Sequence, residues 1–157
     1  MGALRGKRVG LRRDKFWLSW DWITDEWAQL LEKDGADVVI WRAPVGKGDK
    51  EMTEGGEEYA DFINSIDVAV SGLGNCGSCT LWAIHDAVGA LDHGVPTAAV
   101  STEHFEGLAR TLAAQRGHDS LRLKIMPYPL EGLPENEVRE IAREHYEGLV
   151  AVLGASR

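Results

Sequence analysis

Residues 68–88 read VAVSGLGNCGSCTLWAIHDAV and contain both cysteines of the chain, Cys76 and Cys79. The apolar run over residues 67–72 is typical of a strand that is buried on both faces of a sheet. Apolar residues recur at helical spacing over residues 80–93, which predicts a helix after the glycine-rich segment GLGNCGSC. A strand, a glycine-rich connection and a helix in this order are typical of a parallel α/β unit, with the CGSC unit at its turn.

The same alternation of strand and helix extends outward in both directions. Apolar runs predict strands over residues 8–13, 36–42, 67–72, 96–101 and 121–126. Helical spacing predicts helices over residues 19–33, 57–64, 80–93 and 103–116, and a last helix that follows Pro134 and carries Leu153. Three helices are followed by a glycine that stops them: Gly35, Gly94 and Gly117. We therefore expect one α/β domain over residues 1–157, with three α/β/α layers around a mainly parallel sheet of about five strands, Rossmann-like or flavodoxin-like.

A glycine-rich and highly charged segment separates the second predicted strand from the second predicted helix. It covers residues 43–58 and reads APVGKGDKEMTEGGEE. It is too long for a simple turn, so it is predicted to be a loop. Its length leaves two interpretations open, a surface insertion and a mobile cover over a site.

Composition and charge limit the class of protein. The hydrophobic fraction of 44% and the charged fraction of 27% are typical of a globular protein, and no apolar run approaches the roughly 18 residues of a membrane span. The net charge of −8 argues against a nucleic-acid partner. The first residues, MGALRGKRVGLRR, lack the apolar core of a signal peptide. We expect a cytoplasmic protein without a nucleic-acid or membrane partner.

The position of the two cysteines predicts thiol chemistry. Two cysteines cannot close a structural zinc site, which takes four ligands, and we predict no metal. Cys76 is expected just before the helix and Cys79 in or beside its first turn, where the helix N-terminus lowers the pKa of a thiol. Two roles follow: Cys76 attacks, and Cys79 resolves the intermediate or shares the proton. The alternative is a pair of small buried thiols without chemistry.

The glycines of the same segment allow a second interpretation. Gly72, Gly74 and Gly77 are expected to adopt positive φ and to turn backbone amides toward the inside of the loop. Their spacing matches the G-x-G-x-x-G pattern of phosphate-binding turns, which is a weak signal when it stands alone. Ser78 or Thr80 is predicted to cap the following helix.

Other candidates follow from the place of the site in such folds. Ligands of α/β sheets bind beyond the carboxyl ends of the strands. The residues predicted to contact substrate there are Arg13, Trp17, Gly74, Asn75, Gly77, Ser78, Thr80, Thr102 and Tyr128. Glu103 is a candidate general acid or base, although a carboxylate in a first helical turn also complements the helix dipole. Thr102 is equally explained as an N-cap.

Two groups of residues have alternative explanations. Arg12, Arg13 and Lys15 follow the first strand and suit a carboxylate or phosphate, or serve surface solubility. Among the tryptophans of FWLSWDWITDEW, Trp20 and Trp27 fall on the predicted core face of the helix. Trp17 and Trp22 do not, so they are predicted to roof an apolar pocket or to form a dimer contact.

Three stretches carry a family resemblance: SGLGNCGSCT, DAVGALDHGVPTAAVSTEHFEGLA and PYPLEG. They resemble the UGSC family of small bacterial proteins, which is named for a selenocysteine-Gly-Ser-Cys motif and has cysteine-containing members. Cys76 falls at the selenocysteine position and Cys79 at the motif cysteine. The resemblance covers residues 67–132 and does not include FWLSWDWITDEW. A more distant likeness is to the selenoprotein subunit of glycine reductase. The resemblance implies redox or nucleophilic sulfur chemistry at Cys76.

Taken together, these observations predict a thiol-dependent enzyme that acts on a small molecule, of the oxidoreductase or thiol-nucleophile lyase or transferase type. No tightly bound cofactor is expected, and an external thiol reductant would restore the dithiol. Three alternatives stay open. In the first, the chain is a subunit of a larger reductase or biosynthetic complex, or forms a homo-oligomer. In the second, it is a module that binds a phosphate or carboxylate. In the third, Cys76, Cys79 and Glu103 bind a metal ion.

Overall fold

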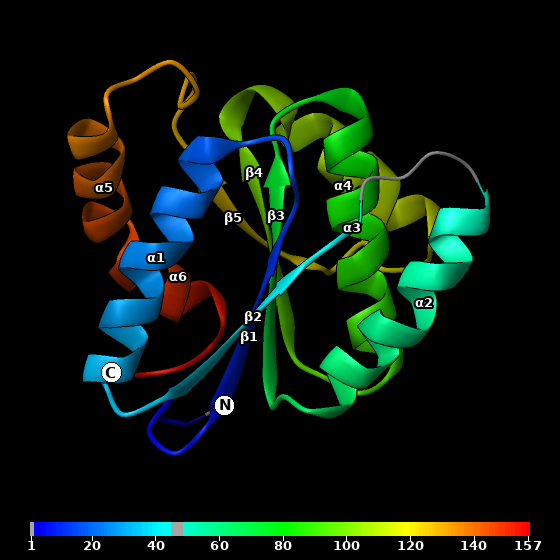
Figure 1. Ribbon diagram of the computed structural model, residues 1–157, viewed down its shortest axis with the longest axis horizontal. Coiled ribbons are helices and arrows are strands. Elements are labelled where there is room, and N and C mark those ends of the chain that lie inside the picture. The colour runs from blue at the N-terminus through cyan, green and yellow to red at the C-terminus, as the bar shows by residue number, and fades with distance from the viewer. Residues whose placement is uncertain (1, 45–48) are drawn as a thin grey trace.

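The computed structural model describes residues 2–44 and 49–157, and its centre is a five-stranded parallel sheet (Figure 1). The strands are β1 (Arg8–Arg13), β2 (Asp37–Arg42), β3 (Val68–Gly74), β4 (Thr97–Thr102) and β5 (Arg122–Met126). Their order is β2-β1-β3-β4-β5, and every neighbouring pair is parallel. This is the flavodoxin-like order, so the predicted fold class is confirmed.

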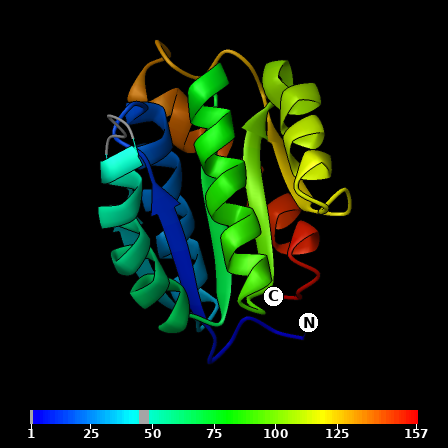
Figure 2. The same ribbon diagram turned by 90° about the vertical axis from the view of Figure 1, so that its right-hand side faces the viewer.

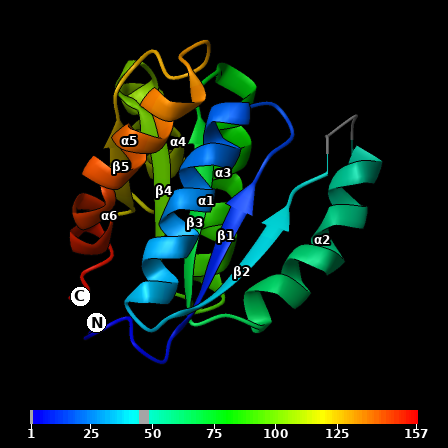
Figure 3. The ribbon, with the colours of Figure 1, turned by 60° about the vertical axis from the view of Figure 1, so that its left-hand side comes forward.

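Helices cover both faces of the sheet, as a three-layer fold requires. The helices α1 (Leu18–Lys33), α5 (Glu135–Glu144) and α6 (Tyr146–Val152) lie on one face, and α2 (Asp49–Asn64), α3 (Gly77–Asp92) and α4 (Glu106–Gln115) lie on the other (Figures 1 and 2). A short 3-10 helix, η1 (Glu103–Phe105), precedes α4. The carboxyl ends of all five strands point to one end of the molecule, where the β1–α1 and β3–α3 connections meet (Figure 3).

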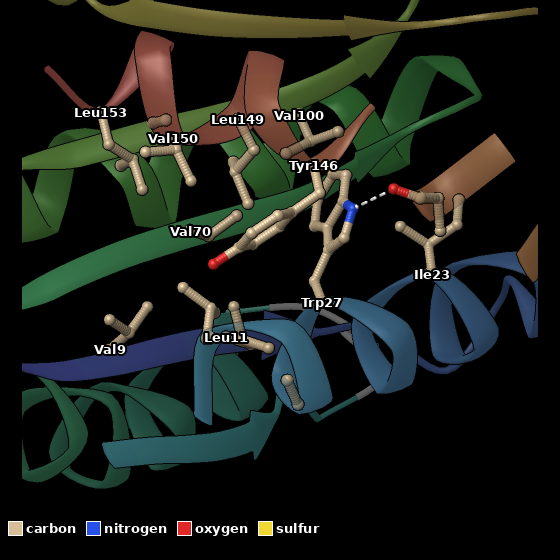
Figure 4. Packing of buried hydrophobic residues seen from close by; sticks show 14 of the residues in the cluster. Val9, Leu11, Ile23, Trp27, Val70, Val100, Tyr146, Leu149, Val150 and Leu153 are labelled. Carbon is tan, nitrogen blue, oxygen red and sulfur yellow. Dashed lines mark hydrogen bonds between the residues drawn. The ribbon is translucent and has the colours of Figure 1, made fainter. Parts of the chain in front are cut away.

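The central strand β3 explains why the apolar run of residues 67–72 has no polar face. All seven of its residues are buried, because α1 covers one of its faces and α3 the other. On the α1 side, Trp20 and Trp27 are fully buried and meet edge to face with ring centroids 5.7 Å apart. The indole of Trp27 donates a 2.8 Å hydrogen bond to the carbonyl of Ala142, which joins α1 to α5 (Figure 4). The assignment of both tryptophans to the core is confirmed.

Two predicted elements differ from the structure. Helix α2 begins at Asp49, so most of the loop predicted over residues 43–58 is helical, and residues 45–48 lie outside the described part. The segment EMTEGGEE contains enough Glu and Met to support a helix despite its two glycines. The predicted last helix is two helices, α5 and α6, which meet at His145. The bend lets Tyr146 enter the core and donate a 2.8 Å hydrogen bond to Asp34.

The glycines of the motif do not have the predicted backbone. Positive φ occurs at Gly35, Gly94 and Gly117, which confirms these glycines as helix stops, but not at Gly72, Gly74 or Gly77. Gly72 and Gly74 belong to β3, and Gly77 opens α3, so the connection between strand and helix consists of two residues only. Gly72 is needed because a Cβ there would lie 2.6 Å from the Trp20 ring. No helix in the described residues is long and apolar enough to cross a bilayer.

We expect Gly72→Ala to lower the free energy of unfolding by roughly 1–3 kcal/mol, because the added methyl group overpacks the buried Trp20 ring. Gly77→Ala is the matched control, since a Cβ at Gly77 meets nothing within 4 Å and alanine suits a helix better than glycine. Urea unfolding followed by tryptophan fluorescence measures both. Equal stability of the two variants would show that the close approach at Gly72 has no energetic consequence.

Candidate functional site

The site is built around Cys76, which is itself the N-cap residue of α3. Its backbone is extended, with φ −158° and ψ 176°, and its Sγ accepts a hydrogen bond from the backbone N–H of Cys79 at 3.1 Å. The predicted cap by Ser78 or Thr80 is wrong. The Thr80 hydroxyl donates to the Cys76 carbonyl at 2.5 Å, and the Ser78 hydroxyl lies 3.6 Å from the Cys76 sulfur. Cys76 is half-buried, so its sulfur combines a donated N–H with access from outside.

Cys79 has a different environment from Cys76. It lies in the first turn of α3, as predicted, and is 3% exposed. Burial raises the pKa of its thiol to about 12, and a hydrogen bond to Cys76, the charge of Cys76 and the charge of Asp14 act in the same direction. The indole N–H of Trp17 lies close to the Cys79 thiol and acts in the opposite direction, lowering its pKa. Cys79 is therefore a protonated thiol at neutral pH.

Asp14 ties the β1–α1 connection to the end of β3. One carboxylate oxygen accepts from the backbone N–H of Leu73 at 3.1 Å, and the other accepts from those of Phe16 at 3.1 Å and Trp17 at 3.3 Å. Burial raises the pKa of Asp14, while these backbone hydrogen bonds and the nearby charge of Arg12 oppose the rise. Asp14 therefore fixes the strand end that carries the CGSC turn.

The opposite side of the turn is held by β4. The buried hydroxyl of Thr102 lies 3.2 Å from the side-chain oxygen of Asn75 and 3.4 Å from the carbonyl of Gly74. Thr102 stands at the N-cap position of η1, but its side chain does not cap that helix. Asn75 is buried as well, so Asn75 and Thr102 position the turn from within.

A cavity of about 190 Å³ opens beside the turn, at the β1 side. It is lined by Arg12, Asp14, Lys15, Phe16, Trp41, Ala43, Pro44, Gly56, Tyr59, Ser78, Cys79, Trp82, His85 and Asp86. It lies outside the carboxyl ends of β1 and β2 and beside the N-terminus of α3. The strand order reverses between β1 and β3, and this is where ligands bind in flavodoxin-like folds.

A buried ion pair lies at the cavity wall. The Nε of Arg12 donates to Asp86 at 2.7 Å, and its Nη1 donates to the carbonyl of Gly72, also at 2.7 Å. Only 4% of the Arg12 side chain and 14% of the Asp86 side chain are exposed. The Tyr59 hydroxyl donates to the Asp86 carbonyl, and burial together with the charge of Asp86 raises the pKa of this phenol. Burial also lowers the pKa of the neighbouring His85.

The predicted site residues divide into two groups. Ser78 lines the cavity together with Cys79, and Trp17 lies beside Cys79. Arg13 instead pairs with Asp21 and Asp25 of α1 and is not among the cavity residues. Beyond β4 and β5, the Glu103 carboxylate accepts the backbone N–H of Tyr128 at 3.4 Å, and the Tyr128 ring stacks on His104. Neither Glu103 nor Tyr128 lines the cavity.

Sequence reasoning missed most of the aromatic wall. Trp41 lies in the second predicted strand, Tyr59 in the second predicted helix and Trp82 in the third, and nothing in their local spacing marks them as neighbours. For the charged part of the wall, the sequence offered one signal, the alternation of side chains along a strand. It places Arg12 and Arg13 on opposite faces of β1, so at most one of them points to the CGSC side.

The described residues offer little for a metal ion. No group of three or more His, Cys, Asp or Glu side chains converges among the side chains that the structure describes, those of residues 2–44 and 56–157. Cys76, Cys79 and Glu103 therefore do not form the three-ligand site that was one of the alternatives.

The fold and the site define a flavodoxin-like α/β domain with two free, unequal thiols at the topological switch point of its sheet. The chain belongs to the UGSC family, whose family model matches residues 1–155. The match extends well beyond residues 67–132, which carry the motif resemblance, and includes the tryptophan-rich N-terminal part.

None of the curated proteins compared with the chain matches it. Among solved structures, a mutant flavo di-iron protein from Thermotoga maritima has a TM-score of 0.49 and 8% sequence identity, over 94% of this chain and 37% of that chain. The chain thus spans little more than a third of that protein, and a likeness of this degree carries no argument about the site.

The two thiols are expected to differ in reactivity toward iodoacetamide at pH 8. In Cys76→Ser, the remaining Cys79 should label very slowly, because a thiol with a pKa of about 12 is almost entirely protonated four units below it. The substitution removes the contributions of Cys76 to that pKa, but burial, the largest cause, stays. In Cys79→Ser, the half-buried Cys76 should label readily.

Time courses of labelling by intact-protein mass spectrometry measure this difference, with both variants unfolded in guanidinium chloride as the control. Unfolded chains should label at equal rates, because burial is lost. The rate for Cys79 should rise only as the pH approaches the pKa of its thiol. Equal labelling of the two folded variants at pH 8 would contradict the assignment.

Proposed function

We propose that this protein is a thiol-dependent enzyme in which Cys76 attacks a small-molecule substrate and Cys79 supplies a proton and then resolves the intermediate. The observation that carries the proposal is the Cys79 N–H hydrogen bond to Cys76 Sγ at the N-terminus of α3. An amide donor and the positive end of a helix both stabilise a thiolate relative to a thiol. The access that half-burial leaves to Cys76 suits an attacking group.

The proposed reaction has two steps, attack by Cys76 and resolution by Cys79. The Cys76 thiolate forms a bond to an electrophilic carbon or sulfur, and the leaving group departs with its electron pair and takes the proton of the Cys79 thiol. The Cys79 thiolate then attacks the Cys76 sulfur, forms a disulfide and releases the bound fragment with the electron pair of the broken bond. The fragment takes a proton from solvent, and a fragment bound through carbon must leave as an anion that an adjacent carbonyl stabilises. The substrate is reduced by two electrons and the dithiol is oxidised, and an external dithiol reductant restores it.

The environment of Cys79 suits the second role better than the first. A buried thiol whose pKa is raised to about 12 holds its proton until a basic leaving group forms beside it. Loss of the thiolate charge of Cys76 on bond formation removes one of the causes of the raised pKa, so Cys79 becomes easier to deprotonate at the point where it must act. A dithiol that must return to the reduced form also fits the cytoplasm, where thiols are kept reduced.

The alternative of a phosphate-binding turn has less support. Four backbone amides around the turn are already used: Leu73 donates to Asp14, Asn75 to Leu73, Cys79 to the Cys76 sulfur and Thr80 to the Cys76 carbonyl. None of the three glycines has the positive φ of an anion nest.

The proposal predicts an ordered reaction with a small symmetric disulfide such as bis(2-hydroxyethyl) disulfide. The wild-type protein should lose two hydrogens as the Cys76–Cys79 disulfide forms, and Cys79→Ser should accumulate the mixed disulfide at Cys76. Cys76→Ser should react at least about a hundredfold more slowly, because the buried Cys79 stays protonated. Intact-protein mass spectrometry at pH 7.5 distinguishes the three products.

The double variant Cys76→Ser, Cys79→Ser is the background control and should keep its mass throughout. Digestion and fragment analysis locate the adduct in Cys79→Ser. The proposal fails if Cys76→Ser reacts as fast as the wild type, or if the mixed disulfide never accumulates in Cys79→Ser. Either result would remove the order in which the two sulfurs act.

A further inference from the structure

The cavity beside the CGSC turn has aromatic walls, a feature that the thiols do not explain. Four aromatic side chains, from the β1–α1 connection, β2, α2 and α3, form its apolar walls: Phe16, Trp41, Tyr59 and Trp82. Trp41 is held in place by stacking on Phe62 at 5.6 Å and by contact with Tyr59 at 5.0 Å. A volume of about 190 Å³ is similar to that of apolar cavities of about 150 Å³ that accommodate a benzene ring.

The carboxylates among the described cavity residues already have partners. The Asp86 carboxylate is paired with Arg12, and the Asp86 carbonyl accepts from Tyr59. Both carboxylate oxygens of Asp14 accept backbone N–H groups, from Leu73 on one side and from Phe16 and Trp17 on the other. Burial lowers the pKa of His85, which keeps this ring uncharged near neutral pH. The described side chains of the wall therefore offer no unpaired carboxylate to a cationic ligand.

The donors at the same wall are only partly used. Arg12 commits Nε to Asp86 and Nη1 to Gly72, while its Nη2 makes none of the hydrogen bonds found in the described part of the chain. That nitrogen is also not one of the buried polar atoms left without a partner, so it stays accessible in a side chain that is 4% exposed and lines the cavity. Lys15, an exposed cavity residue, forms no ion pair with any of the side chains that the structure describes, those of residues 2–44 and 56–157.

From this combination we propose that the cavity binds a small organic carboxylate with a flat, apolar body. The carboxylate receives N–H groups from Arg12 Nη2 and the charge of Lys15, and the body lies between the aromatic walls. A guanidinium edge with free N–H groups is well suited to a carboxylate. This inference rests on the proposed function in one respect: it names the class of substrate that is presented to the cysteines, of which Cys79 borders the cavity.

Binding of four simple probes to the double variant Cys76→Ser, Cys79→Ser tests the proposal without any covalent reaction. The probes are benzoate, benzamide, benzylamine and acetate, and ligand-observed NMR titration gives each Kd. Benzoate should bind at least about tenfold more tightly than acetate, because burial of an aromatic ring contributes more than 1.4 kcal/mol. Benzoate should also bind more tightly than uncharged benzamide, and cationic benzylamine should bind most weakly.

Two lysine variants in the same background locate the bound carboxylate. Lys15→Gln should weaken benzoate binding roughly two- to fivefold, the effect of an exposed ion pair, and leave benzamide unchanged. Lys33→Gln is the matched control, since Lys33 is exposed at the far end of α1 and does not line the cavity. Trp82→Leu should weaken benzoate and benzamide equally, because both lose the same wall.

The outcomes separate this inference from the proposed thiol chemistry. If benzylamine binds as tightly as benzoate, or if Lys15→Gln and Lys33→Gln have the same effect, the cavity is not a carboxylate site. That result would leave disulfide exchange at Cys76 untouched. Conversely, selective benzoate binding in a protein whose cysteines fail the exchange test would keep the site and remove the thiol mechanism.

Discussion

Buried Arg12 joins β1 to β3 and to helices on both faces of the sheet. Its guanidinium joins Asp86 of α3 and the carbonyl of Gly72 in β3, and its own carbonyl accepts the Trp20 indole N–H of α1 at 3.1 Å. Burying an arginine is costly unless it is paired and hydrogen-bonded, and removing one member of such a pair leaves an uncompensated charge worth roughly 3–5 kcal/mol. Both helix layers are thus fixed to the strand end at which the CGSC turn begins.

Rigidity at that strand end is what makes the two thiols unequal. Asp14 holds Leu73 from the β1 side, and Thr102 contacts Asn75 from the β4 side. The connection is then short enough that Cys76 must cap α3, with its sulfur under the amide of Cys79, while Cys79 turns into the interior. Two cysteines three residues apart would have similar chemistry in a flexible loop. Here Cys76 is half-buried and its sulfur accepts an N–H hydrogen bond, whereas Cys79 is buried and protonated.

The same arrangement places one of the two thiols, that of Cys79, at the cavity, whereas Cys76 is not among its lining residues. Ser78 and Cys79 border the cavity. Its far walls come from β2, the edge strand on the other side of β1 from β3, and from α2. Candidates on the β4 and β5 side, such as Glu103 and Tyr128, are joined to each other instead. Substrate contact for these two stays a prediction, whereas the geometry favours the β1 side for a bound molecule.

The amino-acid sequence by itself determined the strand–helix alternation, the parallel sheet, the core face of α1 and the place of Cys76 and Cys79 around the start of α3. These follow from local periodicity and from helix boundaries, which neighbouring residues specify. It did not determine the backbone of the motif glycines, the helical start of α2 or the break at His145, because packing against distant residues decides these. Only the tertiary structure brought Trp41, Tyr59 and Trp82 to one cavity and chose Arg12 over Arg13 for its wall. The physical reason is that strand order and side-chain direction, which no local pattern encodes, decide which distant residues meet.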